Sequence, residues 1–311
     1  MTSDAIARAE AILRAACGER VRTRFPLAPL TSFRLGGPAA LYLEPETDED
    51  LAAVGSAIVE TEVPFVILGK GSNVIVSDEG FPGLVLRLGR GYRWAARDND
   101  RVTSGGAMPL PALSGVALRH GLTGLEFGVA IPATVGGAIR MNAGAHGREM
   151  AEVVRDVRVF HLRSGRPGTI AAGDAGFGYR RSGLPDDAVV TGGALHLEAG
   201  DPAAIRSLME EAREWRRRTQ PLAEPNCGSV FQNPPGDHAA RLIDAAGGKG
   251  LRVGGAEVSR KHANFIVAGP VARAADVLAL IREVQALVLR DQGVALEPEV
   301  KLIGAFDDAR R

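Results

Sequence analysis

Apolar residues recur at helical spacing in several segments of the chain. Between 201 and 219, Ile205, Leu208 and Ala212 would share one helix face, with Asp201 as the N-cap. The N-terminal segment, in which acidic residues and arginines alternate with apolar residues, has the same amphipathic character. The pattern predicts further helices at 48–63, 109–120, 238–246 (capped by Asp237) and 271–292.

Shorter apolar runs, rich in β-branched residues and punctuated by glycine and proline, predict strands between these helices. They occupy 39–45, 64–69, 73–78, 83–88, 101–106, 153–162, 168–172, 188–199, 256–269 and 294–304. The segment 124–147 carries too many glycines for a simple helix or strand. Helices and strands are therefore mixed, and the proline that ends the 201–219 helix marks a plausible domain boundary.

Composition narrows the class of protein. A chain of 311 residues can form two domains, and Lys plus Arg equals Asp plus Glu at 37 each, so the charge balance indicates neither nucleic acid nor a membrane surface. Cys17 and Cys227 are too few for a disulfide framework or a cysteine zinc site, and His146 and His262 have no partners at metal spacing. We expect no metal, no membrane segment and a cytoplasmic location.

Two glycine-rich segments are candidate cofactor loops. Gly69, Gly71, Ser72 and Asn73 follow an apolar strand, but their spacing fits neither a Walker A loop nor a Rossmann fingerprint. A glycine-rich hairpin turn explains them equally well. The presence of a second such segment, at 124–147, favours a dinucleotide.

Candidate catalytic side chains lie in three further motifs. Arg180 is either a surface charge or a fixed donor to a developing oxyanion. Glu297 and Glu299 would point to one face of a strand, where one of them becomes a proton donor only if burial raises its pKa. In "NCGSVFQNP", the candidates are Cys227 as a nucleophile and Ser229 in another role.

Seven motifs, in order, resemble the family of UDP-N-acetylenolpyruvoylglucosamine reductases over nearly the whole chain. They are "TSFRLGGPA", "LGKGSN", "GLEFGVAIPATVGG…MNAGAHG", "FGYRRS", "PNCGSVFQNP", "GGAEVSRKHANFIV" and "LEPEVKLIG". The resemblance implies an α+β fold, with an FAD-binding region of the vanillyl-alcohol-oxidase type in two subdomains at 1–200. A connecting helix at 201–219, a substrate-binding α+β lobe at 220–295, and a strand and tail at 296–311 that return to the FAD region would follow.

The resemblance also implies the chemistry. NADPH reduces non-covalently bound FAD, a hydride passes from flavin N5 to C3 of the enolpyruvyl group, and Ser229 protonates C2, giving UDP-N-acetylmuramate for peptidoglycan synthesis. Arg180 and Glu299 would stabilise the charge that builds on the substrate. The implied FAD contacts are Gly69, Lys70, Gly71, Ser72, Asn73, Gly136 and Gly137. The implied nucleotide-sugar contacts are Tyr179, Gln220, Asn233 and His262.

The sequence departs from the family pattern at three positions. Ala133 replaces a usual glycine, Cys227 a common alanine and Gln232 a common lysine, so Cys227 is expected to be a packing residue. The short separation between Arg180 and Ser229 resembles the subtype without an inserted, tyrosine-bearing segment, and we expect a more exposed nucleotide. A monomer or weak oligomer is expected. The alternatives are a flavin-dependent alcohol oxidase or dehydrogenase of the same fold, and a non-catalytic nucleotide-binding protein.

Overall fold

The structure, a computed structural model, describes residues 3–306; residues 1–2 and 307–311 of the predicted N-terminal helix and C-terminal tail lie outside this range. The chain divides into two compact units that are interleaved in sequence. Unit 1 comprises the residues up to Thr23, Leu41–Lys70 and Gly83–Trp215, and unit 2 comprises Arg24–Ala40, Gly71–Pro82 and the residues from Arg216 onward.

The helices occur close to where the amphipathic pattern predicts them. They are α1 (Ser3–Cys17), α2 (Asp48–Thr61), α3 (Leu110–Arg119), α4 (Val135–Arg140), α5 (Pro202–Thr219), α6 (Ala239–Ala245) and α7 (Ala274–Gln292). The side chain of Asp201 accepts hydrogen bonds from the first N–H groups of α5, as the sequence predicts for its N-cap.

Three helix predictions need correction. The helix α4 forms within the glycine-rich segment, because the Thr134 hydroxyl accepts a hydrogen bond from the Gly137 N–H at 3.2 Å. The helix α6 is not capped by Asp237; the side-chain oxygen Oδ1 of Asn233 accepts from the Ala239 N–H at 3.1 Å. The helix α7 begins at Ala274 and not at 271, because its first N–H groups donate to the carboxylate of Asp78.

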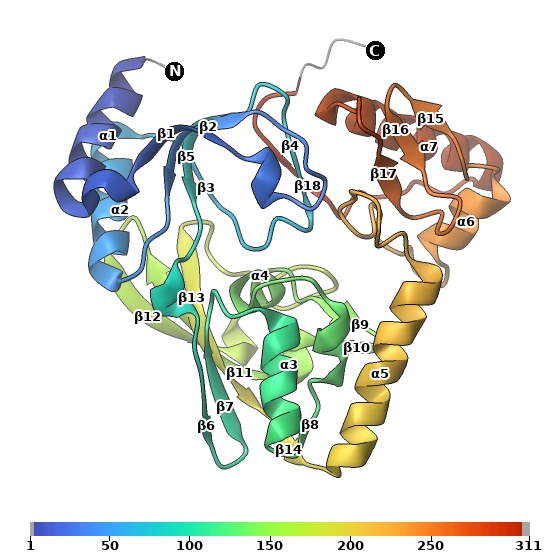
Figure 1. Ribbon diagram of the computed structural model, residues 1–311, viewed down its shortest axis with the longest axis horizontal. Coiled ribbons are helices and arrows are strands. Elements are labelled where there is room, and N and C mark those ends of the chain that lie inside the picture. The colour runs from blue at the N-terminus through green and yellow to red at the C-terminus, as the bar shows by residue number, and fades with distance from the viewer. Residues whose placement is uncertain (1–2, 307–311) are drawn as a thin grey trace. The chain divides into compact units, whose positions relative to one another are not determined.

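Unit 1 contains a five-stranded antiparallel sheet with the strand order β12-β11-β13-β7-β6. Its strands are β6 (Ala95–Asp98), β7 (Arg101–Gly105), β11 (Val154–His161), β12 (Arg166–Ala171) and β13 (Ala188–His196). The helix α4 packs against β13, and α3 and α4 lie in front of this sheet in Figure 1. Their buried apolar side chains form one continuous core with the sheet.

A second core forms around a four-stranded sheet of order β1-β2-β5-β3. Its strands are β1 (Arg22–Pro26), β2 (Pro38–Leu43), β3 (Phe65–Ile67) and β5 (Phe81–Leu86), and the chain passes from one unit to the other within β1, β2 and β5. The packed pair α1 and α2 contributes apolar side chains to this core. Each of these two sheets therefore has a hydrophobic core of its own within unit 1.

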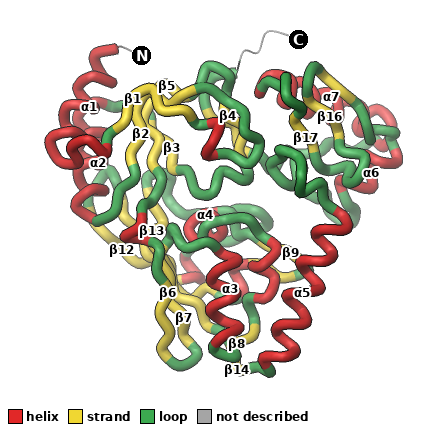
Figure 2. Tube along the Cα trace, viewed as in Figure 1, coloured by secondary structure: helices red, strands yellow, loops and turns green. Residues whose placement is uncertain are grey.

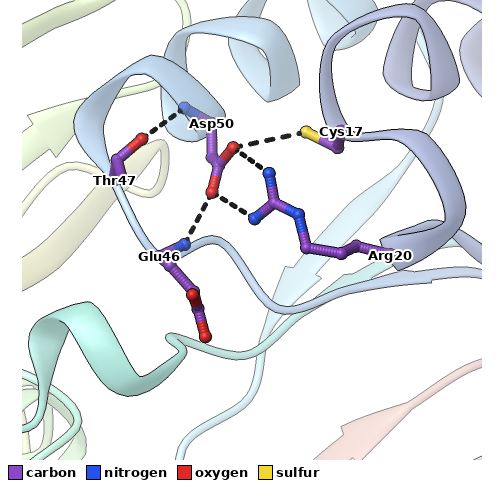
Figure 3. A network of polar contacts seen from close by, with 5 residues as sticks. All are labelled: Cys17, Arg20, Glu46, Thr47 and Asp50. Atoms are coloured by element: carbon purple, nitrogen blue, oxygen red, sulfur yellow. Dashed lines mark hydrogen bonds and ion pairs between the residues drawn. The ribbon is translucent and has the colours of Figure 1, made fainter.

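A partly buried ion pair joins Arg20, just after α1, to Asp50 in the first turn of α2 (Figure 3). The Arg20 guanidinium donates two hydrogen bonds, of 2.6 and 2.5 Å, to the Asp50 carboxylate, which also accepts from the Glu46 N–H. The hydrogen bonds to Arg20 lower the pKa of Asp50 to about 2. The thiol of Cys17 lies 3.6 Å from the same carboxylate and is buried, and burial raises its pKa to about 11. These contacts thus connect α1 and α2 within unit 1, and their role is structural.

Unit 2 is built from helices and short strands around one apolar core. A three-stranded antiparallel sheet of β15 (Arg252–Val253), β16 (Ala256–Val258) and β17 (Ile266–Ala268) packs against α7, which also contacts α6. Two further strands, β4 (Val74–Val76) and β18 (Lys301–Ile303), pair in parallel. The two-stranded pairs β9–β10 (Gly144–Ala145 and Arg148–Glu149) and β8–β14 (Leu122–Thr123 and Glu198–Ala199) belong to unit 1. Figure 2 shows how much of the chain around β15 to β17 is loop.

Three strand predictions also need correction. The segment after β3 is no hairpin turn, because β3 pairs with β5 and β4 pairs with β18. The extended segment predicted at 256–269 is a hairpin of β16 and β17 with a turn between them. The strand predicted at 294–304 is confined to Lys301–Ile303, and the residues before it pair only through an isolated bridge at Pro298.

Within residues 3–306, no helix is both long and apolar enough to cross a bilayer. The same residues contain no cluster of three or more His, Cys, Asp or Glu side chains suited to holding a metal ion.

Candidate active site

Ser229 lies in unit 2, in a segment held from the side by the residues around Glu299. The Glu299 N–H donates to the Val230 carbonyl at 2.8 Å, and the Gln232 N–H donates to the Glu297 carbonyl at 2.9 Å. An antiparallel bridge joins Phe231 to the proline between the two acids. Tertiary structure thus places two of the predicted catalytic residues on neighbouring segments, although about 70 positions separate them.

The two acids of the "LEPE" motif differ in their surroundings. Glu297 is exposed, whereas Glu299 is half-buried. The side-chain amide of Asn73 donates to the Glu299 carbonyl at 3.3 Å, and the Lys301 N–H donates to the Asn73 carbonyl at 3.0 Å. The expectation that both acids occupy one strand is wrong, since the strand begins only at Lys301. Burial therefore distinguishes Glu299 from Glu297.

Burial separates Cys227 from Ser229. The side chain of Cys227 is 2% exposed and belongs to the apolar core of unit 2, and burial raises the pKa of its thiol. Ser229 is half-buried. Gly228, between them, has φ of +77° and donates its N–H to the Asn226 side chain at 2.9 Å. Cys227 is thus a packing residue, as expected.

Three predicted substrate contacts of unit 2 each hold part of the fold. The Gln220 side chain accepts from Arg216 Nε at 2.9 Å, and Asn233 accepts from the first N–H of α6. His262 accepts from the Asn264 N–H through Nδ1 at 3.3 Å, and burial lowers its pKa. His262 is therefore neutral near pH 7, with its proton on Nε2.

Arg180 and Tyr179 lie in unit 1, on a loop that follows the five-stranded sheet's β12. The guanidinium carbon of Arg180 is 4.6 Å from the centre of the Tyr179 ring, and one guanidinium nitrogen donates to the Gly144 carbonyl at 3.2 Å. The backbone of Arg180 has φ of +56°, which is uncommon for a residue with a side chain. The loop is consequently held in one specific conformation.

Asn142 supports this loop, and the sequence analysis assigned it no role. It is completely buried, donates from its side chain to the Gly178 carbonyl at 3.0 Å and accepts from the Ala151 N–H at 2.9 Å. Its own φ is +41°, a value that asparagine tolerates better than most residues. Only its place in the glycine-rich segment indicated that it was unusual.

Four predicted cofactor residues line one pocket of unit 1. A pocket of about 390 Å³ is lined by Gly69, Lys70, Gly136 and Gly137, together with Thr134. A Cβ added at Gly69 would lie 2.8 Å from the Thr134 hydroxyl, and one added at Gly136 would lie 2.9 Å from the Val190 carbonyl. Glycine is needed at both positions because the end of β3, α4 and β13 approach closely.

The charges around this pocket suit an anionic cofactor. Its lining contains four arginines and one lysine against a single acid, Glu44; the arginines are Arg87, Arg90, Arg93 and Arg140. Arg140 donates to the carbonyls of Leu184 and Pro185 and is fixed in place. The pyrophosphate of FAD carries negative charge, so the residues of the pocket fit this cofactor. The sequence analysis did not select these arginines, which are too far apart to form a motif.

The remaining predicted cofactor residues, Gly71, Ser72 and Asn73, belong to unit 2. Gly71 has φ of +69°, and a Cβ there would lie 2.1 Å from the Leu30 carbonyl. Ala133, which replaces a usual glycine, is not among the described residues of positive φ, so alanine is accommodated without strain.

Two family models match separate parts of this chain. Residues 39–170 match an FAD-binding domain, and residues 220–303 match the C-terminal domain of UDP-N-acetylenolpyruvoylglucosamine reductase. The reductase 2 of Symbiobacterium thermophilum is 48% identical over 286 residues, which cover 92% of this chain and 92% of that protein. The reductase of Anaeromyxobacter sp. (strain Fw109-5) is 46% identical over 97% of this chain and 94% of its own.

Solved structures are also similar to this chain. The crystal structure of UDP-N-acetylenolpyruvylglucosamine reductase from Thermus caldophilus covers 91% of this chain and 99% of its own, with a TM-score of 0.80 and 41% identity. A variant of Phl p 4, a glucose oxidase, has a TM-score of 0.52 at 12% identity, a likeness that concerns the fold alone.

These matches confirm the predicted fold class, which is α+β with an FAD-binding region of the vanillyl-alcohol-oxidase type. FAD is accordingly the cofactor, and the enzymes of the matching family use FAD and NADPH. With 48% identity over 92% of its length, the chain belongs to the UDP-N-acetylenolpyruvoylglucosamine reductase family.

Proposed function

We propose that this protein reduces UDP-N-acetylenolpyruvoylglucosamine to UDP-N-acetylmuramate at the expense of NADPH, a step in peptidoglycan precursor synthesis. The observation that carries the proposal is the pairing of the Ser229 and Glu299 segments within unit 2, in a chain of this family. Bound FAD would transfer the hydride of NADPH to C3 of the enolpyruvyl double bond. The rest of the chemistry is assigned to side chains of this chain.

Ser229 is the proposed proton donor. Adding hydride to C3 leaves an electron pair at C2, beside the substrate carboxylate, and the hydroxyl proton of Ser229 goes to that carbon. Serine is a weak acid, and it can act here because the C2 carbanion is strongly basic and the donor is held in place. Its half-burial and the hydrogen bonds of its neighbours support this role.

Arg180 and Glu299 are the proposed stabilisers of the developing charge. A guanidinium presents two parallel N–H groups that match a carboxylate, and the Arg180 group is already oriented by Tyr179 and Gly144. A protonated Glu299 would donate to the same charge. Tyr179, Gln220, Asn233 and His262 stay proposed contacts of the nucleotide sugar.

For the cofactor, we propose Gly69, Lys70, Gly136 and Gly137 as contacts in unit 1 and Gly71, Ser72 and Asn73 as contacts in unit 2. The basic lining of the unit 1 pocket supports the placement of the pyrophosphate near Lys70. Domain roles follow: residues 1–200 hold FAD, 220–295 hold the substrate, and 296–311 return to the FAD region.

A pair of variants tests the proposal. The purified protein should absorb near about 450 nm, as oxidised flavin does, and should oxidise NADPH only when the enolpyruvyl nucleotide is present. Ser229→Ala should keep reduction of the flavin by NADPH and lose turnover. Ser207→Ala, on the exposed side of α5, should match the unmodified enzyme. Full turnover by Ser229→Ala, or flavin reduction by an alcohol followed by reoxidation with oxygen, would contradict the proposal.

A further inference from the structure

Asn264 holds the two residues that follow Ser229. Its side-chain oxygen accepts from the Phe231 N–H at 2.9 Å, and its side-chain nitrogen donates to the Phe231 carbonyl at 2.8 Å. Its backbone carbonyl accepts from the Val230 N–H at 2.9 Å. One residue, 4% exposed, therefore makes three hydrogen bonds to two consecutive residues.

The side chain of Asn264 takes the place of a neighbouring β-strand beside Phe231. An amide side chain that both accepts from and donates to one residue does what a neighbouring β-strand would do. The Val230 carbonyl, which Asn264 does not use, accepts from the Glu299 N–H on the other side. The segment 230–232 is thus held on one flank by Asn264 and on the other by residues 297–299.

The segment before Ser229 is fixed by a second asparagine. The Asn226 side chain accepts from the Gly228 N–H at 2.9 Å, and the Asn226 carbonyl accepts from the Ser32 hydroxyl at 2.6 Å. Ser229 therefore stands between two fixed backbone segments, while its own side chain is left half-exposed.

We infer that Asn264 is a positioning residue for Ser229: it sets the direction of the proton-donating hydroxyl without touching the substrate. The inference rests on the proposed function, in which Ser229 protonates C2. Proton transfer from a weak acid depends on placement, and a displacement of about 1 Å can cost roughly a hundredfold in rate. If one of the two side-chain hydrogen bonds of Asn264 were lost, the buried N–H or carbonyl of Phe231 would have no partner. The segment would then move to regain one.

Hydrogen exchange distinguishes a local loosening of the segment after Ser229 from a general loss of stability. In Asn264→Ala, the backbone amides of Val230 and Phe231 should exchange faster, measured by mass spectrometry on a peptide spanning 226–233. The matched control is Asp78→Ala, which likewise removes two hydrogen bonds between a side chain and the backbone of unit 2, here those from the N–H groups at the start of α7. That control should leave exchange in the peptide unchanged.

Stopped-flow measurement of the two half-reactions in the holoenzyme gives the functional readout. Asn264→Ala should reduce its flavin with NADPH at the normal rate. Reoxidation by the enolpyruvyl nucleotide should slow roughly tenfold to a hundredfold. Asp78→Ala, corrected for its folded fraction, should be normal in both half-reactions.

Asn264→Asp is a conservative variant in which both side-chain hydrogen bonds to Phe231 can be restored. A protonated carboxyl accepts from the Phe231 N–H and donates to the Phe231 carbonyl, whereas an ionised one opposes that carbonyl. Its reoxidation rate, relative to the unmodified enzyme at each pH, should rise as the pH falls, and that of Asn264→Ala should not. This variant also carries the test should Asn264→Ala fail to fold.

The inference is overturned if reoxidation in Asn264→Ala is normal while Ser229→Ala is inactive, or if both half-reactions slow equally. It is also overturned if the Asn264→Asp rate does not rise at low pH. Failure of the unmodified enzyme to oxidise NADPH with the nucleotide would instead reject the proposed function, so the two failures are distinguishable.

Discussion

The backbone N–H of Glu299 donates a 2.8 Å hydrogen bond to the carbonyl of Val230, the residue directly after Ser229. This bond ties a loop that follows α5 to a segment near the C-terminus. Both segments carry a proposed catalytic side chain, and hydrogen bonds join them within unit 2. The relationship gives the predictions for Glu299 a direct internal control, since Glu297 lies two positions away and is exposed.

We expect Glu299→Ala to lower kcat about a hundredfold to a thousandfold, the usual loss when one donor to a developing charge is removed. Glu299→Gln should lose less, because an amide still donates a hydrogen bond. Flavin reduction by NADPH should remain normal in both variants. The matched variant Glu297→Ala should change kcat less than threefold; equal losses at the two positions would contradict the assignment.

Arg180→Lys should raise the KM for the nucleotide, lower kcat, or do both, with a combined loss in kcat/KM of roughly tenfold to a hundredfold. A lysine keeps the charge but lacks the planar fork that binds a carboxylate through two hydrogen bonds. Steady-state kinetics checks this. The neighbouring Arg181 is exposed, so Arg181→Lys should have little effect. Comparable kinetics for the two lysine variants would show that Arg180 is only a surface charge.

Asp50→Asn should lower the free energy of unfolding by about 1–2 kcal/mol at pH 7, a figure reduced for the partial exposure of Arg20. Because Arg20 lowers the pKa of Asp50 from 3.8 to about 2, the ion pair stabilises the fold above pH 4. This contribution is lost as the pH falls from about 4 towards 2. Urea denaturation at several pH values measures it.

The control for this variant is Asp4→Asn, which removes an exposed ion pair to Arg8 on α1. It should cost less than about 0.5 kcal/mol at any pH. A difference between Asp50→Asn and the unmodified protein that stays constant down to pH 2 would mean that the Arg20 pair is not the source of the stabilisation.

Cys227→Ala should retain kcat within about twofold and lose about 1 kcal/mol of stability, because a small buried side chain is shortened. In the unmodified protein, a thiol-specific reagent should not inactivate the native enzyme, since burial raises the thiol pKa and blocks access. Rapid inactivation at pH 7 that Cys227→Ala abolishes would show that the thiol is reachable.

Helices were well predicted wherever local signals specify them. Asp201 before Pro202 starts α5, and Gly293 ends α7, because caps act within one turn. The start of α7 was missed by three residues, since Asp78, nearly 200 positions away, supplies its cap. The "LEPE" segment was taken for a strand because its residue types suit one, but among the described residues it forms a single isolated β-bridge, between Pro298 and Phe231, and no ladder.

The residues of the candidate site also fall into two groups: those that sequence motifs indicate and those that only the structure identifies. The motifs around Arg180, Ser229 and Glu299 could be found in the sequence because each is compact. Asn142 and Asn264 could not be selected, since an isolated asparagine carries no local signal and acquires its role only through distant backbone groups. The arginines lining the unit 1 pocket were missed for the same reason.

The sequence alone determined most of the helices, the family resemblance and the candidate chemistry, because propensity, capping and motif spacing act over a few residues. Only the tertiary structure decided which strands pair, that Cys227 is fully buried while Ser229 is half-buried, and which of the two acids is half-buried. Burial and hydrogen-bond partners depend on residues far apart in the chain, and these contacts form only when the hydrophobic cores assemble.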